Sequence, residues 1–195
     1  MGGQVLMVKG KKDYGKLFES AIKKSGDEAF SIYIYRIKDS GSAFNPNQDS
    51  GLRFTSSNDY DFMVYEKPNF FPMELKSCGQ TSISFQRKDK KKGKMIKWHQ
   101  IEGLKKASLV DGVFAGLLME FRKYGHTYWL NIEDFIRFMD TSTKGSINEK
   151  DVIEYGGVLM EQKLKRVNYS YNLPKLLLDI KEKYKWYHGK TESHK

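Results

Sequence analysis

The alternation of apolar and polar positions predicts a helix followed by several strands in the first part of the chain. Asp13 suits a helix N-cap, and apolar residues then recur every three or four positions as far as Gly26, which is typical of an amphipathic helix. β-Branched and aromatic residues fill three later segments, which predicts strands at 29–38, 59–66 and 70–77.

The pattern changes again in the middle of the chain. Residues 95–110 return to helical spacing. The continuous apolar run 112–121 is typical of a strand that is buried on both faces, and 127–132 has the composition of another strand. The order of these elements predicts one α/β domain with a central mixed sheet.

Two more helices are expected near the C-terminus. Ser146 and Glu149 have the spacing of a capping box, which predicts a short helix over 147–155. Pro174 suits the first turn of a last helix over about 174–186.

The polar segments divide the chain into an arm, a domain and a tail. Residues 1–12 are expected to be a flexible basic arm, 13–186 to form the domain and 187–195 to be a disordered tail. Residues 39–58 are rich in turn-forming residues and predict a long loop. Loops of that length inside a compact domain are often functional.

The amino-acid composition predicts a polyanionic partner. The 195 residues include 34 Lys and Arg against 24 Asp and Glu, a formal charge of +10, which favours DNA, RNA or an anionic membrane surface. The single cysteine, Cys78, excludes an intrachain disulfide, and no apolar run is long enough for a membrane helix. The N-terminus lacks the order of a signal peptide, so we expect a cytoplasmic protein.

The stretch DYDFMVYEKPNFFPMELK, residues 59–76, places charged residues within an apolar hairpin. Glu74 and Lys76 are two apart and share a face of their strand, while Asp61 shares a face with Met63 in the partner strand. A turn centred on Pro68–Asn69 sets Asp61 opposite Lys76 and Met63 opposite Glu74. The two carboxylates then become diagonal neighbours.

Two carboxylates that point together repel unless a proton or a cation lies between them. Their hard oxygens suit Mg²⁺ or Mn²⁺, and a bound metal of this kind can activate water for phosphodiester hydrolysis. Lys76 can orient that water and stabilise negative charge. The alternative is an ordinary cross-strand salt bridge on the surface, because acids and lysines are common residues.

The same stretch resembles the PD-(D/E)xK nuclease motif through DYDF and MELKS. Six blocks in one order resemble RecU-type Holliday junction resolvases of Gram-positive bacteria and their phages, also called penicillin-binding-protein-related factor A. These blocks are YGKLFESAIKKS, YIYRIKD, DYDFMVYEKPNFFPMELKS, HQIEGLKKA, GVFAGLLMEFR and TYWLNIEDF. The resemblance spans about residues 13–140 and is weaker over the last fifty.

The resemblance implies a restriction-endonuclease-like fold and a homodimeric, Mg²⁺- or Mn²⁺-dependent endonuclease that resolves four-way DNA junctions. Six positions match the family's site: the catalytic trio Asp61, Glu74 and Lys76, the metal-ligating carbonyl of Leu75, the acid Glu19 of the first helix and the polar Gln100 of the helix that flanks the site. The familiar resolvases carry a longer stalk before the catalytic aspartate, where this chain has only 39–58. A short stalk would fit a phage-encoded version.

Basic residues near the hairpin are the candidates for DNA contacts. The segment 86–94 is a basic loop that can bind phosphates, although such loops are more often simply solvated. Arg36 ends a predicted strand and has two alternatives, a DNA contact or an ion pair with Asp39. The expected DNA-binding set is Arg36, Arg87, Lys88, Lys90, Lys91, Lys92, Lys97 and His99.

Two other functions stay open on the sequence. One is a restriction or repair endonuclease of the same superfamily that acts on other DNA. The other is an architectural DNA-binding protein without catalytic activity.

Overall fold

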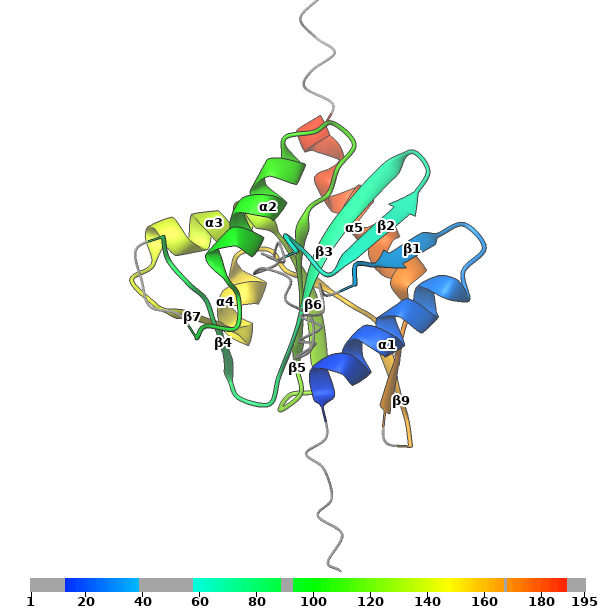
Figure 1. Ribbon diagram of the computed structural model, residues 1–195, viewed down its shortest axis with the longest axis horizontal. Coiled ribbons are helices and arrows are strands. Elements are labelled where there is room, and N and C mark those ends of the chain that lie inside the picture. Colours follow the sequence, from blue (N-terminus) through cyan, green and yellow to red (C-terminus); the bar gives the residue numbers. More distant parts are fainter. Residues whose placement is uncertain (1–12, 39–57, 89–92, 167, 189–195) are drawn as a thin grey trace, which may run out of the picture.

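A six-stranded mixed sheet forms the centre of the molecule in the computed structural model, which describes residues 13–38, 58–88, 93–166 and 168–188 (Figure 1). Only the two central strands, β3 and β5, run parallel, and the other neighbours are antiparallel. Helices flank this sheet, which confirms the predicted fold class. In sheet order, the strands are β1 (Tyr33–Arg36), β2 (Phe62–Glu66), β3 (Asn69–Cys78), β5 (Gly116–Phe121), β6 (His126–Asn131) and β8 (Val158–Leu159).

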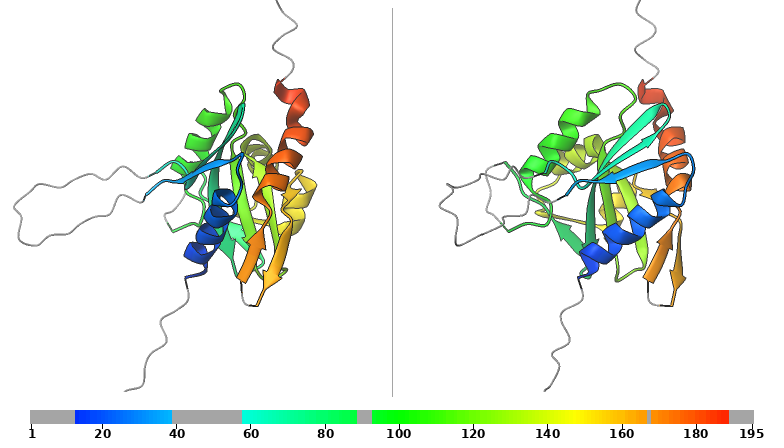
Figure 2. Two further views of the ribbon diagram at one scale, coloured as in Figure 1. Left: turned by 90° about the vertical axis from the view of Figure 1, so that its right-hand side faces the viewer. Right: turned by 45° about the vertical axis from the view of Figure 1, so that its right-hand side comes forward.

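One face of the sheet packs against the first and last helices. α1 (Tyr14–Asp27), α5 (Leu173–His188) and the two-stranded ribbon of β9 (Gln162–Lys165) and β10 (Asn168–Tyr171) cover this face (Figure 2). Phe18 and Ile22 of α1 meet Phe62, Val64 and Met73 of the sheet in one apolar cluster.

A second apolar cluster fills the opposite face. The elements that cover it are α2 (Trp98–Ser108), α3 (Ile132–Thr141), α4 (Glu149–Glu154) and a ribbon of β4 (Ser82–Ser84) and β7 (Ser146–Asn148). Ile101 and Leu104 of α2 turn inward, as the helical spacing of 95–110 indicates. β5 is buried on both faces, as its apolar run indicates.

Helix boundaries follow the expected signals at the N-terminus but not in the small helix α4. Asp13 caps α1, because its carboxylate accepts a hydrogen bond of 3.2 Å from the backbone N–H of Lys16. The capping box of α4 uses Asn148 and Asp151, so the prediction from Ser146 and Glu149 is wrong. Ser146 is unavailable because it pairs with β4 as part of β7.

Several predictions about loops and ends fall outside the described residues. These are the arm at 1–12, nearly all of the loop at 39–58 and most of the tail at 187–195. The first strand is shorter than 29–38, since β1 comprises only Tyr33–Arg36. Within the described part of the chain, no helix is long and apolar enough to cross a membrane.

Candidate active site

The hairpin of β2 and β3 turns one residue earlier than the sequence predicts. Phe62 lies opposite Met73, and this register makes Lys67 and Pro68 the two residues of the turn. The prediction of a turn centred on Pro68–Asn69 is therefore wrong. Asn69 begins β3 and takes part in the ladder instead.

The corrected register brings the two carboxylates closer together than predicted. Met63 lies opposite Pro72 and not Glu74. Asp61 immediately precedes β2, its backbone N–H donates to the Met73 carbonyl at 3.1 Å, and its carboxylate interacts with that of Glu74, so it does not lie opposite Lys76. Moving the turn by one residue shifts the pairing of the two strands by two, so Met63, Glu74 and Lys76 keep their predicted faces.

Glu74 is a fully buried carboxylate, and the described residues donate hydrogen bonds to only one of its oxygens. The side chain is 0% exposed. Its Oε1 accepts hydrogen bonds from Lys76 Nζ and, at 2.6 Å, from Gln100 Nε2 of α2. No described residue donates to the buried Oε2. Leaving a buried carboxylate oxygen without a partner is costly, so Oε2 needs a proton or a cation.

Gln100 is held in place by its own helix. Its Oε1 accepts a hydrogen bond of 2.9 Å from the backbone N–H of Lys97, the residue that precedes α2. This contact fixes the side-chain amide so that Nε2 points at Glu74. The structure therefore brings Gln100 to the predicted site and orients it.

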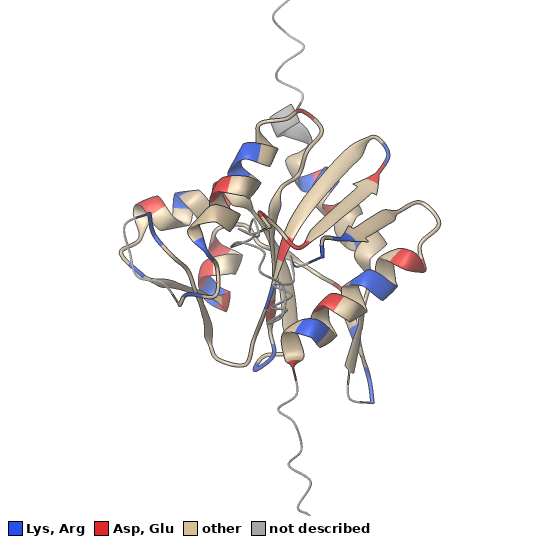
Figure 3. Cartoon of the chain, viewed as in Figure 1, with Lys and Arg blue, Asp and Glu red and all other residues tan. Residues whose placement is uncertain are grey.

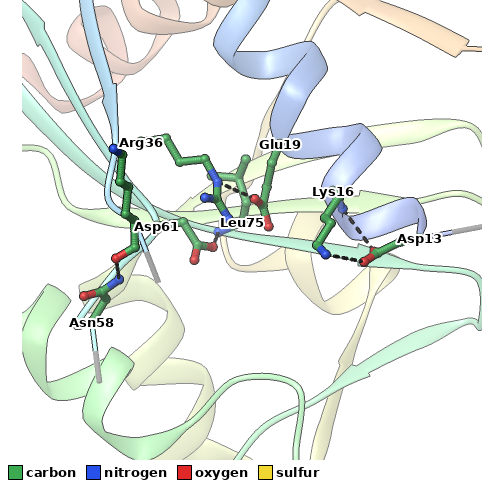
Figure 4. Close-up of polar contacts among 8 residues, drawn as sticks. Asp13, Lys16, Glu19, Arg36, Asn58, Asp61 and Leu75 are labelled. Atoms are coloured by element: carbon green, nitrogen blue, oxygen red, sulfur yellow. Dashed lines mark hydrogen bonds and ion pairs between the residues drawn. The ribbon is translucent and has the colours of Figure 1, made fainter. Parts of the chain in front are cut away.

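Asp61 is anchored immediately before β2 and lies at the same site. Its Oδ2 accepts a hydrogen bond of 2.8 Å from the backbone N–H of Leu75, and Figure 4 shows the side chain turned toward that backbone. The backbone carbonyl of Asp61 also accepts from Ile37 N–H at 2.8 Å, which fixes the main chain. These bonds leave the Asp61 carboxylate beside Glu74.

Burial raises the pKa of the Glu74 carboxyl to about 8. The Lys76 ammonium opposes this rise, and the neighbouring Asp61 carboxylate adds to it. Burial without a metal therefore favours the protonated form of Glu74. A carboxyl with a strongly raised pKa beside a second acid is typical of a functional site.

Glu19 and Arg36 pair with each other next to this site. Arg36 Nε of β1 donates to Glu19 Oε2 of α1 at 2.6 Å (Figure 4). The alternative partner Asp39 lies outside the described residues. Because Glu19 is engaged by a guanidinium, we expect it to position Arg36 rather than to bind a metal directly.

Arg87, one of the expected DNA-binding residues, has a structural role here. Its guanidinium donates to the carbonyls of Met139, Ser142 and Lys144 at 2.7, 2.6 and 2.9 Å. These carbonyls lie at the C-terminal end of α3, where helices leave acceptors unsatisfied. These contacts occupy three N–H donors of Arg87, and its contact with DNA stays a prediction.

The other basic candidates for DNA contacts are exposed, half-buried or outside the described residues. Lys88 and Lys97 are exposed and His99 is half-buried, while Lys90, Lys91 and Lys92 lie outside the described residues. Lys97 and His99 flank the start of α2, close to the Gln100 that contacts Glu74. These residues stay candidates for phosphate contacts.

The donors at this site fit a divalent cation of the Mg²⁺ or Mn²⁺ type. Glu74 Oε2 lacks a donor among the described residues and Asp61 lies beside it, so two hard oxygen ligands converge. No group of three or more His, Cys, Asp or Glu side chains that could hold a metal occurs in the described ranges. A metal here would therefore use two carboxylates, with the Leu75 carbonyl as the expected third ligand.

Sequence reasoning missed a second buried glutamate and an exposed aromatic face. Glu120 of β5 is buried among hydroxyl groups, and Tyr33, Tyr35 and Tyr65 are exposed on β1 and β2. The alternation of Tyr33, Ile34 and Tyr35 was a signal for the second feature, since it predicts a strand with one uncovered face.

Comparisons with known proteins give one clear relative. No known family model matches the sequence. The SPbeta prophage-derived uncharacterized protein YotM of Bacillus subtilis (strain 168) is 31% identical over 186 residues, which cover 89% of this chain and 90% of that protein. The solved structure of Archaeoglobus fulgidus Hjc, a Holliday junction resolvase from an archaeal hyperthermophile, matches with a TM-score of 0.43 and 11% identity over 73% of this chain and 89% of that one. Membership of the RecU-type resolvases stays a prediction.

Proposed function

The chain belongs to the family of the prophage-derived protein YotM, and from this premise we propose that it is a divalent-metal-dependent DNA endonuclease whose preferred substrate is the four-way junction. A prophage relative fits a phage-encoded enzyme that acts on DNA in a bacterial cytoplasm. The observation that carries the proposal is the buried Glu74 Oε2, which has no donor among the described residues and lies beside Asp61.

Three residues of the site hold the two carboxylates in place. The Leu75 N–H fixes one oxygen of Asp61, and Gln100 together with Lys76 fixes one oxygen of Glu74. Each carboxylate thus presents its other oxygen. A divalent cation bound by these oxygens would supply activation of water and neutralisation of charge on a phosphate.

Lys76 is the candidate for stabilising negative charge on the scissile phosphate. Its side chain is only 16% exposed, so its charge acts in surroundings from which water is largely excluded. The same ammonium favours the charged form of Glu74. Lys76 is therefore expected to interact both with Glu74, a proposed metal ligand, and with the scissile phosphate.

Net charge supports DNA as the partner. The formal charge of +10 attracts a polyanion, and lysines and arginines lie along several helices in Figure 3. The preference for four-way junctions rests on the sequence blocks that resemble RecU-type resolvases. A homodimer would present two such sites to the two equivalent strands of a junction, so that both cuts occur within one bound lifetime.

Cleavage of three DNA substrates by the purified protein tests this proposal. A four-way junction, a flap and a linear duplex of shared sequence are incubated with Mg²⁺, with Mn²⁺ and with EDTA. We expect paired nicks in the junction only when metal is present. Cleavage of the linear duplex at the same rate would favour a restriction or repair enzyme, and binding without any cleavage would favour an architectural protein.

A further inference from the structure

The sheet has an uncovered aromatic face next to the proposed active site. Tyr33 of β1 lies directly opposite Tyr65 of β2, and Tyr35 lies opposite Met63. Tyr33, Tyr35 and Tyr65 are 63%, 43% and 44% exposed. The residues between them, Ile34 and Val64, are buried in the apolar cluster beneath α1 and α5.

This face differs from ordinary scattered exposure of single apolar residues. Exposed apolar side chains are common on protein surfaces when they stand alone. Three rings that share one face of two paired strands form a contiguous patch, and such patches mark binding surfaces. We name Tyr33, Tyr35 and Tyr65 the tyrosine face.

The tyrosine face continues directly into the carboxylate site. Asp61 precedes Met63 by two residues, and its carboxylate accepts a hydrogen bond from the backbone N–H of Leu75 in β3. Because Tyr35 is opposite Met63, it is the diagonal neighbour of Asp61, a Cα separation of about 7–8 Å. That distance is short enough for one nucleotide to reach from a ring on Tyr35 to the carboxylates.

We propose that the tyrosine face stacks unpaired bases of DNA while the adjoining phosphate lies at Asp61 and Glu74. The inference rests on the proposed nuclease function and adds the part of the substrate that is recognised. Sheet faces that carry aromatic side chains are well suited to this task, since every base has a flat face that can stack on a ring.

The chemistry around the face favours DNA over a second copy of the chain. Lys38 follows β1 and Lys67 forms the turn after β2, so an exposed cation lies at each end of the face. Cations beside rings suit a strand whose bases stack while its phosphates stay charged. A second copy would bring the same cations together, which disfavours that occupant.

Single-strand binding by matched variants tests the inference. In the triple variant, Tyr33, Tyr35 and Tyr65 are each replaced by Thr, which keeps a residue suited to strands. In its counterpart, each is replaced by Phe, which keeps the ring. Fluorescence anisotropy in EDTA measures affinity for a labelled 20-nucleotide single strand and for a duplex of the same sequence. The control is Tyr124→Thr, which removes a ring that is 42% exposed in the turn after β5.

We expect the Thr variant to bind the single strand at least about tenfold more weakly, with little change for the duplex. The Phe variant and Tyr124→Thr should bind like the wild type. Unchanged single-strand affinity in the Thr variant, or an equal loss for duplex, would overturn the inference. Dissociation of a dimer by the Thr substitutions in sedimentation would also overturn it, by showing that the face joins two copies.

Because these measurements contain no metal, they are independent of cleavage. If the wild-type protein cuts no DNA but the Thr variant loses single-strand binding, the proposed nuclease function fails and the stacking face stands. If the wild type cuts junctions and the Thr variant binds the single strand normally, the stacking face fails and the proposed nuclease function stands.

Discussion

Two buried glutamates on adjacent strands have opposite surroundings. Glu120 of β5 is 6% exposed, and both of its oxygens are satisfied by hydroxyl groups. Ser77 Oγ donates to Oε2, and Tyr171 Oη donates to Oε1 at 2.8 Å. Glu74 of β3 is buried as deeply but has one oxygen without a donor among the described residues.

Burial alone therefore does not identify a functional acid. Glu120 ties β3, β5 and β10 together through neutral donors, which is a structural role. Glu74 has a lysine, a second carboxylate and an open acceptor around it, which is the arrangement that a cation would complete. The predictions below separate the two glutamates experimentally.

Replacing Asp61 should have the largest effect on activity. Asp61→Asn removes one of two carboxylates from the proposed metal site, and we expect cleavage to fall by about 1,000-fold or more. DNA binding should be retained or slightly tighter, because negative charge near a phosphate is lost. Cleavage of a four-way junction with Mg²⁺ and anisotropy in EDTA measure the two properties.

Asp59→Asn is the matched control, since it lies only two residues away. A Cβ on Gly103 of α2 would fall 2.3 Å from Asp59 Cβ, so Asp59 packs against that helix. Asp59 is not among the charged residues that shift the pKa of Glu74. This variant should keep most of the cleavage rate. If Asp61→Asn cuts at the wild-type rate, the assignment of the site is wrong.

The pH dependence of stability should differ between the wild type and Glu74→Gln. The pKa of Glu74 is about 8 in the folded protein against an ordinary value of 4.5, so the folded state favours its protonated form. The metal-free wild type therefore loses stability as the pH rises from about 4.5 to about 8. Relative to Glu74→Gln, we expect a loss of about 1–4 kcal/mol over this range.

Urea unfolding in EDTA at pH 5 and pH 8 measures this difference. The Gln variant lacks the titrating group, so its free energy of unfolding should change less between the two values. Parallel pH profiles for the two proteins would contradict a raised pKa at Glu74.

The sequence predicted the fold better than the details of the site. The apolar periodicities of α1, α2 and β5 are strong local signals, and the structure bears them out. The faces of Glu74 and Lys76 also followed from strand alternation. These features depend on residues that are close together along the chain.

What could not be predicted depends on contacts between distant segments. The turn at Lys67–Pro68 is set by which residues of β2 and β3 pair, and a shift by two residues leaves the apolar pattern unchanged. The ion pair between Glu19 and Arg36 joins two elements whose relative placement the sequence does not encode locally.

Removing the amide of Gln100 should give an intermediate loss. Gln100→Ala leaves Glu74 with Lys76 as its only described donor, and residues that orient ligands typically contribute 10–100-fold to metal affinity or activity. We expect the Mg²⁺ concentration for half-maximal cleavage to rise by about that factor. Glu102→Ala, at an exposed position of the same helix, should leave it unchanged, and equal shifts in both variants would point to a general effect on α2.

Glu120→Gln should have the smallest effect and act on stability. The amide nitrogen cannot accept from a hydroxyl, so one hydrogen bond with Ser77 or Tyr171 is weakened, at a cost of about 1–2 kcal/mol in the free energy of unfolding. Urea unfolding measures this cost, and junction cleavage below the unfolding transition should match the wild type. A loss of cleavage comparable to that of Asp61→Asn would remove the distinction between the two glutamates.

The most direct test of the central claim is calorimetric titration of the wild type and Glu74→Gln with Mn²⁺ at pH 7, each in two buffers of different ionisation enthalpy. We expect the wild type to bind Mn²⁺ and release up to about one proton per site, because the metal replaces the proton that the raised pKa of Glu74 favours. We also expect Glu74→Gln to lose both the binding and the proton release. Equal Mn²⁺ binding by the two proteins, or no binding by the wild type at millimolar Mn²⁺, would contradict the assignment of Glu74 and Asp61 as a metal site.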